Sequence, residues 1–312
     1  MQIPKEILNL FPTWQYQCPK CGSHLGYEPI EHCIKCGAKF TPEQARVPPR
    51  FLKNPKATSD FAHKVLAPKL SPKMRVLLFK YFTTIFSDGF ESNDFSAWTG
   101  TSCHANNTLQ VQSVEKKQGT YASKHILAAS HAQDDSYCYK DIISQTTCFM
   151  RLYVKITEVA GKYDSRRFGI MQVVGATGAH SGGTYQYAGV YFLADRKLQL
   201  VCRTTVGNIY DTSATTLTLN QWYCIELKFV EHASAGEVRV YLDGIEVADL
   251  TNTGLNTAVW SGIDSVQCGS SNGYYNEAET HATFYTDCVV VADAYIGPLP
   301  AASQLIHVIN PP

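Results

Sequence analysis

The chain contains 312 residues, of which 45% are hydrophobic and 17% charged, and its 27 basic residues balance its 27 acidic residues. This length has room for about two domains, each large enough to bury a core. No segment approaches the roughly 18 uninterrupted apolar residues of a membrane-spanning helix, and no basic N-terminal segment precedes an apolar run. The sequence therefore predicts no membrane span and no secretory signal peptide, and we expect synthesis in the cytoplasm.

The charges are unevenly distributed along the chain. Residues 1–86 hold 13 basic and 5 acidic residues, whereas the remainder holds 14 basic and 22 acidic residues. A basic front segment can dock on nucleic acid or on an acidic partner, and an acidic remainder can hold cations. The alternative is that these charges serve solubility and attraction between the two segments.

Two Cys-x-x-Cys pairs, each followed by glycine and separated by eleven residues, stand near the N-terminus. Two thiolates held on a tight turn can take adjacent corners of a tetrahedron around a metal ion. The four ribbon cysteines are Cys18, Cys21, Cys33 and Cys36. The pattern resembles the zinc ribbon family, which implies one structural zinc ion and no catalysis; iron or a redox-active dithiol is the alternative. We expect a zinc ribbon at residues 1–48, and docking on a protein through residues 1–86 rather than on nucleic acid.

Residues 49–86 mix proline, lysine and apolar residues at helical spacing, and Ser71-Pro72 fits an N-cap followed by proline at the first helical position. They predict a basic helical linker. From residue 87 the hydrophobic period changes to two, as in "TCFMRLYVKI", "QWYCIELKFV" and "EVRVYLDGIEV". Asp243-Gly244 between alternating runs predicts a type I′ hairpin turn. The sequence thus predicts a mainly β, two-sheet antiparallel sandwich at residues 87–300, followed by a C-terminal tail at 301–312.

Two segments near the ends of this region resemble the opening and closing strands of the concanavalin A-like jelly roll. They are "FSDGFESNDFSAWTGT" at residues 86–101 and "FYTDCVVVADAYIGP" at residues 284–298, supported by "NQWYCIELKF" and "VRVYLDGIEV". The superfamily includes laminin-G-like modules, lectins, β-glucanases and alginate lyases. The resemblance implies a jelly-roll fold over most of residues 87–298 and names no ligand.

The catalytic motifs of the superfamily are incomplete in this chain. Its β-glucanase branch places paired acids along one strand as Glu-x-Asp-x-(x)-Glu, and no such run occurs here. Its alginate lyase branch uses a Gln-x-His strand with a Tyr-Phe-Lys-Ala-Gly-x-Tyr strand. Here Gln172 is followed two residues later by Val174, and "YFLADRKLQL" lacks the Lys-Ala-Gly-x-Tyr pattern. We therefore expect no catalytic residues, with a polysaccharide lyase or glycoside hydrolase as the alternative.

Two segments rich in glycine and serine carry aromatic residues suited to stacking on sugar rings. In the first, three tyrosines at a period of two would share one face, and the second places two at a loop tip. The candidate ligand residues are Tyr185, Tyr187, Tyr191, Tyr274, Tyr275 and His180, with Trp260 as a weaker candidate. We expect the rings of Tyr185 and Tyr187 to be exposed; the alternative is that these tyrosines pack in the sheets.

Acidic residues gather at both ends of the predicted jelly roll. They are Asp88, Glu91 and Asp94 in the opening turn and Asp287 and Asp293 beside the closing strand. Carboxylate oxygens are hard ligands that calcium favours, and related jelly rolls hold calcium between these strands. We expect a calcium site here; the alternative is a solvated acidic edge.

Taken together, these features predict a non-catalytic protein that binds a glycan or cell-surface polysaccharide, or serves in adhesion. An intracellular type of metal knuckle joined to a lectin-like sandwich fits a virion- or tail-associated protein whose zinc ribbon is an anchor. A purely structural coat or scaffold module is a further alternative. The sequence leaves open whether the chain forms a homo-oligomer and whether any of the seven cysteines outside the ribbon pair.

Overall fold

The computed structural model describes residues 84–128, 135–160, 167–175, 186–271 and 281–299, together with the short pieces 15–17, 20, 24–26, 36, 39 and 46–47. The chain divides into two compact units, Met1–Thr84 and Ile85–Pro312. The described part of the first unit contains a small sheet in the order β2-β1-β3, formed by β1 (Gln15–Gln17), β2 (His24–Gly26) and β3 (Arg46–Val47).

Several predictions for the first unit and the tail fall outside the described residues. They concern Cys18, Cys21 and Cys33, residues 49–83 of the linker, and the tail at 301–312. Cys36 is described and lies exposed in a turn. The last three residues of the predicted linker, 84–86, belong to a strand instead.

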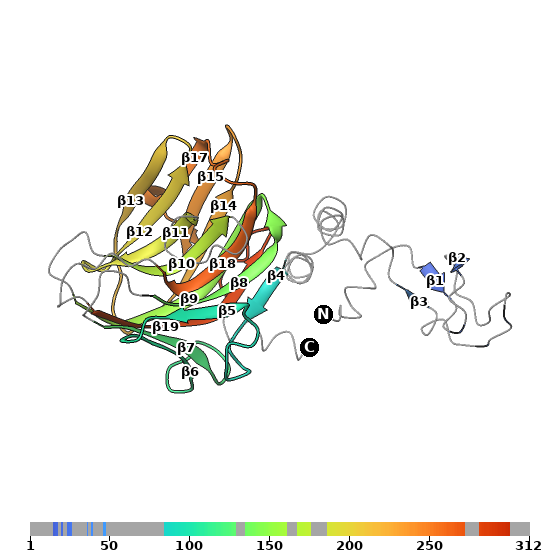
Figure 1. The fold of residues 1–312 in the computed structure, drawn as a ribbon, viewed down its shortest axis with the longest axis horizontal. Helices are drawn as coiled ribbons and strands as arrows, with labels where there is room; N and C mark the ends of the chain where they lie inside the picture. The colour runs from blue at the N-terminus through green and yellow to red at the C-terminus, as the bar shows by residue number, and fades with distance from the viewer. Residues whose placement is uncertain are drawn as a thin grey trace, which may run out of the picture. The chain divides into compact units, whose positions relative to one another are not determined.

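The second unit is a sandwich of two antiparallel sheets, as predicted (Figure 1). The seven-stranded sheet follows the order β13-β12-β11-β10-β18-β8-β5. Its strands are β5 (Gly100–Cys103), β8 (Ser136–Gln145), β10 (Arg167–Gly175), β11 (Gln186–Leu193), β12 (Lys197–Thr204), β13 (Gly207–Thr216) and β18 (Ile263–Ser270).

The nine-stranded sheet follows the order β16-β15-β14-β9-β19-β7-β6, with β17 paired to β15 and β4 paired to β19. Its strands are β4 (Thr84–Asp88), β6 (Thr108–Gln112), β7 (Ala122–Leu127), β9 (Thr147–Ala160), β14 (Trp222–Val230), β15 (Gly236–Leu242), β16 (Ile245–Glu246), β17 (Asn252–Leu255) and β19 (His281–Ala292). Among all the residues that the structure describes, no helix is long and apolar enough to cross a membrane.

Along β9 and β14, every second side chain projects into the core that the two sheets share. On β14, Ile225 and Leu227 pair with Leu152 and Met150 of β9, and all four side chains are buried. Directly opposed residues of an antiparallel pair project to the same face, so the intervening residues project outward. The core therefore lies between the sheets, where the ring of Tyr187 from β11 meets that of Phe229 from β14 at 4.9 Å between centroids.

The β15–β16 connection confirms the hairpin predicted from Asp243-Gly244. Leu242 pairs with Ile245 across a two-residue turn, and the φ angles of Asp243 and Gly244 are 50° and 85°. Positive φ at both central positions is the type I′ geometry, which fits the twist of the flanking strands.

After β19, residues 293–299 form a strap across the outer side of the nine-stranded sheet. The buried Glu226 carboxylate accepts hydrogen bonds from the backbone N–H groups of Ile296 (2.9 Å) and Gly297 (2.8 Å). The Tyr295 hydroxyl donates to the carbonyl of Gly244, and the Leu299 N–H donates to the Tyr153 hydroxyl at 2.8 Å. The strap thus covers polar side chains that project outward from β9 and β14.

Candidate functional site

The outward face of the seven-stranded sheet collects amide and aromatic side chains from strands distant in sequence. In register, Gln172 of β10 lies between Gly189 of β11 and Gln267 of β18. One row along, Tyr191 of β11 pairs with Gln199 of β12. These residues alternate with core residues of the same strands, so their side chains project away from the nine-stranded sheet.

An arginine stands between two tyrosine rings on this face. The Arg167 guanidinium lies 4.9 Å from the ring centroid of Tyr191 and 5.1 Å from that of Tyr210. Its Nη1 also donates to Gln199 Oε1 at 3.1 Å. Stacking on aromatic faces fixes a guanidinium in place while leaving other N–H donors for a partner.

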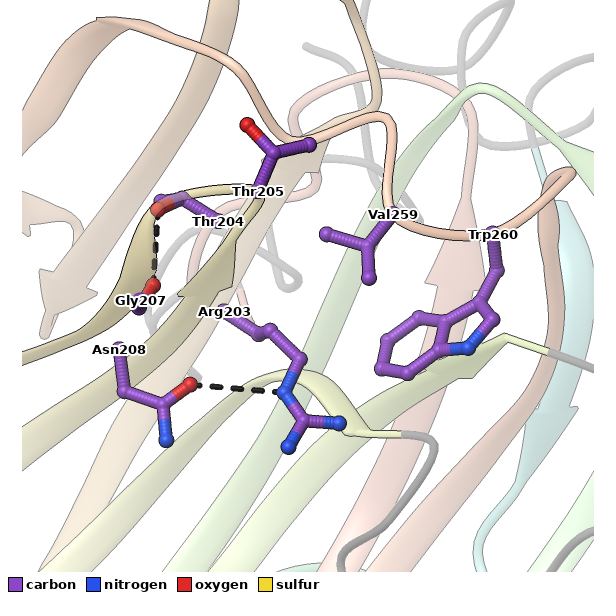
Figure 2. Close-up of a pocket in the computed structure, with 7 residues that line it drawn as sticks. All are labelled: Arg203, Thr204, Thr205, Gly207, Asn208, Val259 and Trp260. Carbon is purple, nitrogen blue, oxygen red and sulfur yellow. Dashed lines mark hydrogen bonds between the residues drawn. The ribbon is translucent and has the colours of Figure 1, made fainter.

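A second arginine–aromatic pair borders a hollow at the end of β12 and β13. The Arg203 guanidinium lies 5.3 Å from the ring of Trp260, and Arg203 Nε donates to Asn208 Oδ1 at 3.4 Å. Figure 2 shows the Arg203 side chain directed toward the indole of Trp260. The hollow is a shallow depression open to solvent, has a volume of about 580 Å³, and is lined by Arg203, Thr204, Thr205, Gly207, Asn208, Val259 and Trp260.

The two pairs are joined along the face. Asn208 Nδ2 donates to the Tyr210 hydroxyl at 3.0 Å, so one amide contacts both the Arg203 side and the Arg167 side. Val201 pairs with Tyr210, and Arg203 pairs with Asn208, which puts all four residues on the same face of the β12–β13 ladder. Among the described residues of β10 to β13, no carboxylate projects from this face; Asp211 pairs with the core residue Leu200 and accepts from Asn252.

The hollow is built from two walls that are tied to the rest of the sandwich. The Thr205 N–H donates to the Asn256 carbonyl at 3.0 Å, which links the β12–β13 turn to the segment that carries Trp260. The Tyr187 hydroxyl accepts a hydrogen bond from the backbone N–H of Trp260 at 3.1 Å and donates one to Glu231 Oε1 at 2.8 Å. Its ring meets the indole of Trp260 edge to face at 4.8 Å. Tyr187 therefore positions Trp260 from inside the core.

Buried amides form the floor beside these arginines. Gln172 Nε2 donates to the Ser271 carbonyl at 3.0 Å, and the Tyr191 hydroxyl donates to Gln186 Oε1 at 2.7 Å. Within the described part of the chain, Gln186 Nε2 is buried with no acceptor. Gly189 makes this packing feasible, because a Cβ there would lie 2.5 Å from Gln186 Nε2 and 3.0 Å from Gln172 Cγ.

The prediction that Tyr185, Tyr187 and Tyr191 share one face of the sheet is wrong for Tyr187 and Tyr191, the two that the structure describes. Tyr187 is fully buried in the core and Tyr191 is 1% exposed on the opposite, outward face. The cause is a bulge in β11: Val173 and Val174 pair with Ala188 and Gln186, so Tyr187 is an extra residue and the alternation breaks. Burial raises the pKa of Tyr191 to about 12, which keeps its hydroxyl protonated at neutral pH.

The remaining candidate tyrosines, Tyr185, Tyr274 and Tyr275, lie outside the described residues, as does His180. Sequence reasoning missed Arg167, Arg203 and Tyr210. The available signal was their type and position: an arginine before one β run, an arginine at the end of another, and a tyrosine seven residues after the second arginine. The structure places Tyr210 at 52% exposure beside Arg167.

The carboxylates of the predicted calcium site mostly accept hydrogen bonds from N–H groups. Asp88 accepts from the Phe90 N–H and from Trp98 Nε1 at 2.7 Å, and Glu91 accepts from the N–H groups of Thr120 and Tyr121. Asp94, which is exposed, accepts from Ser96.

Asp287 is fully buried and accepts from the N–H groups of Lys117, Gln118 and Cys288. Asp293 lies at the start of the strap. Over the ranges that the structure covers, no group of three or more histidine, cysteine or acidic side chains has the arrangement to hold a metal ion. The calcium site stays a prediction.

Comparisons with known proteins bear on the fold alone. The sequence matches no protein family description and no curated protein. Among solved structures, the chain is similar to an endo-β-1,4-glucuronan lyase from the fungus Trichoderma reesei, with a TM-score of 0.50 and 14% identity over 69% of this chain and 95% of that one. It is also similar to the cellulose-induced protein Cip1, with a TM-score of 0.51 and 16% identity over 69% of this chain and 100% of that one. The β-sandwich is therefore shared with carbohydrate-related proteins.

Strand β11 also carries part of the alginate lyase strand pattern. Residues 188–191 read Ala-Gly-Val-Tyr, which agrees with the Ala-Gly-x-Tyr end of the alginate lyase strand, and Tyr187 stands where that strand has lysine. Val174 stands where the other strand of that pattern has histidine, and Tyr187 is buried in the core. Gln172 and Tyr191 remain, both on the outward face.

Proposed function

We propose that this chain binds an acidic glycan, such as a uronate-containing polysaccharide, across β10 to β13 on the outward face of the seven-stranded sheet. The observation that carries the proposal is the pair of arginine–aromatic contacts, Arg167 with Tyr191 and Tyr210, and Arg203 with Trp260, joined by Asn208.

The chemistry of the face supports an acidic ligand. A guanidinium presents a fork of N–H donors that matches a carboxylate, and an aromatic ring covers the apolar side of a sugar. With two arginines and no carboxylate on this face of β10 to β13, the local field over these four strands favours an anion.

The test is calorimetric titration of the full-length protein with uronate oligosaccharides and with neutral oligosaccharides of equal length. We expect binding of the uronates that weakens with added salt, because screening reduces the attraction between exposed charges. Arg203→Gln should lower the affinity by about tenfold, the loss of one charge-assisted hydrogen bond. The matched control is Arg239→Gln on the opposite sheet, where Arg239 pairs with Glu237 and Glu246.

Equal binding of neutral and acidic sugars would refute the acidic preference. An absence of binding to every sugar in a broad glycan panel would refute the proposed function. An Arg239→Gln variant that loses affinity as much as Arg203→Gln would show that the effect is one of overall charge and not of this site.

A second candidate function is polysaccharide cleavage by β-elimination. It is favoured by the side-by-side placement of Gln172 and Tyr191 around Gly189, with Arg167 stacked on the Tyr191 ring. In such a reaction Arg167 and Gln172 would neutralise the uronate carboxylate, and the protonated Tyr191 hydroxyl would supply a proton to the leaving oxygen. This requires the face to open, because Gln172 and Tyr191 are each 1% exposed and the Tyr191 hydroxyl donates to Gln186. A base is still needed, and β10 to β13 place no histidine and no carboxylate on this face.

The two functions are separated by an absorbance assay. Uronate polymers are incubated with the protein, and the ultraviolet absorbance of unsaturated uronates is followed. Product formation that Tyr191→Phe abolishes would establish the lyase. Binding in the calorimeter with no product would leave the chain as a glycan-binding protein.

A further inference from the structure

Two buried cysteines lie directly opposite each other in the seven-stranded sheet. Cys138 of β8 pairs with Cys268 of β18 in antiparallel register, and both side chains belong to the core. Directly opposed residues of an antiparallel pair have Cα atoms about 4.5 or 5.5 Å apart, and disulfides span about 4.4–6.8 Å between Cα atoms. The backbone therefore already has the separation that a disulfide requires, and Cys138 Sγ lies 3.7 Å from the Cys268 carbonyl oxygen.

A polar chain leads from Cys268 across the core to a histidine. The Cys268 thiol donates to Thr286 Oγ1 at 3.2 Å, and Thr286 Oγ1 lies 3.2 Å from His125 Nε2. His125 Nδ1 lies 2.8 Å from the Ser136 carbonyl oxygen. Because a carbonyl only accepts, Nδ1 carries the hydrogen and Nε2 is the acceptor. The Thr286 hydroxyl can thus donate to Nε2 while it accepts from the thiol, which gives the thiol proton a path to the imidazole.

This environment distinguishes Cys268 from an inert buried thiol. Burial acts to raise the pKa of Cys268, but its hydrogen bonds with Cys138, His125 and Thr286 outweigh burial and lower the pKa. The pKa of Cys138 is instead raised well above the ordinary value, chiefly by burial. The thiolate is the nucleophilic form, so the two sulfurs have different roles: Cys268 attacks first, and Cys138 follows.

We infer that Cys138 and Cys268 are a redox-active pair that closes to a disulfide when a small hydroperoxide enters the core by local opening, since neither thiol is exposed in the closed fold. The Cys268 thiolate attacks the peroxide, so that an S–O bond forms, the O–O bond breaks, and an alcohol or water leaves with a proton from His125. Cys138 then attacks the sulfenic sulfur, its proton passes to the departing hydroxide, and water leaves. Two thiols and one hydroperoxide thus give one disulfide, one alcohol or water, and one further water.

The disulfide would connect two neighbouring strands that are far apart in sequence. Cys138 and Cys268 are 130 residues apart in sequence. A disulfide that closes so long a loop reduces the entropy of the unfolded state, so the oxidised protein should unfold at a temperature about 10 °C higher. The inference concerns the core and does not depend on the proposed glycan site.

The chain supplies its own control cysteines. Cys148, Cys202 and Cys224 are also buried, but the residues opposite them are Phe229, Ala188 and Tyr153. None of the three therefore has a cysteine across the ladder. They should remain reduced under conditions that oxidise the pair.

The experiment treats the folded full-length protein with hydrogen peroxide, blocks remaining thiols after unfolding, and maps peptides without reduction. We expect a peptide linking Cys138 to Cys268, a higher unfolding temperature, and reversal of both by dithiothreitol. In Cys138→Ser, dimedone should label Cys268 and not Cys148. Recovery of both thiols in alkylated form from oxidised folded protein would overturn the inference, and so would linkage of either cysteine to a different partner. The wild-type map decides the matter even if the variant fails to fold.

Discussion

The strap predicts a pH dependence of stability that resides in one carboxyl group. Glu226 is 1% exposed, and burial raises its pKa from 4.5 to about 7, against the opposite effects of the Ile296 and Gly297 N–H groups and of Arg151. The folded protein therefore holds this proton more tightly than the unfolded chain. Stability from this group is fully present below a pH of about 4.5 and is lost as the pH rises to about 7. The loss amounts to about 3 kcal/mol, since one pKa unit corresponds to about 1.4 kcal/mol.

Glu226→Gln removes the titration and should flatten this part of the stability curve. Its amide can accept only one of the two strap N–H groups, so the variant loses about 1–2 kcal/mol at low pH, and its stability should change less with pH than that of the wild type. The assay is denaturant unfolding followed by tryptophan fluorescence at several pH values between about 4 and 8.

The matched variant is Glu237→Gln on the neighbouring strand β15. Burial acts to raise the pKa of Glu237, but hydrogen bonds from Lys228 and Arg239 outweigh it and lower the pKa, so this group contributes stability as the pH rises through the acid range. Its removal should therefore lower stability by a constant amount above a pH of about 4.5 and leave the fall toward neutral pH unchanged. An unchanged slope in Glu226→Gln, or the same flattening in Glu237→Gln, would refute the assignment to Glu226.

Other consequences can be measured independently. Trp260→Ala should weaken acidic-glycan binding by about tenfold or more in calorimetry, the loss of one aromatic platform, and should also lower the unfolding midpoint because the indole packs against Tyr187. Tyr187→Phe keeps the ring but removes the hydroxyl that accepts from the Trp260 backbone N–H, so it should weaken binding severalfold and shift the tryptophan emission. Unchanged emission would count against a role of Tyr187 in positioning Trp260. Gly189→Ala should destabilise the protein by about 1–3 kcal/mol in denaturant unfolding, because its Cβ meets Gln186 and Gln172. Elemental analysis should find about one zinc per chain, removed by a strong chelator and absent when the four ribbon cysteines are replaced by serine.

The sequence predicted those strands and turns that are determined by residues adjacent in the chain. Alternation along residues 222–230 and the Asp243-Gly244 turn fixed strands and a hairpin that the structure confirms, because side-chain period and positive φ are properties of adjacent residues. The tyrosine row failed for the opposite reason. The bulge at Tyr187 depends on how β11 pairs with β10, and pairing register is not written in either strand alone.

The candidate site shows the same limit of local reasoning. Arg167 and Tyr210 meet across two intervening strands, and Arg203 meets Trp260 from a segment more than fifty residues away in sequence. Each residue has ordinary neighbours in its own strand, and only the strand order β13-β12-β11-β10 brings them together. Composition predicted aromatic ligand contacts but gave no indication of the arginines that lie beside the rings of Tyr191, Tyr210 and Trp260.

The strap also sets how the sandwich would respond to mechanical load. Its contacts with Tyr153, Glu226 and Gly244 follow one another along the chain, so tension from the C-terminal end breaks them one at a time, as in peeling. Strand β19, which precedes the strap in the chain, is hydrogen-bonded to β7 on one side and to β9 on the other. Pulling on β19 would therefore load both sets of hydrogen bonds in shear. Seven residues released from the surface lengthen the connection by roughly 20 Å. The strap can therefore absorb a pull as extension before the load reaches the sheets.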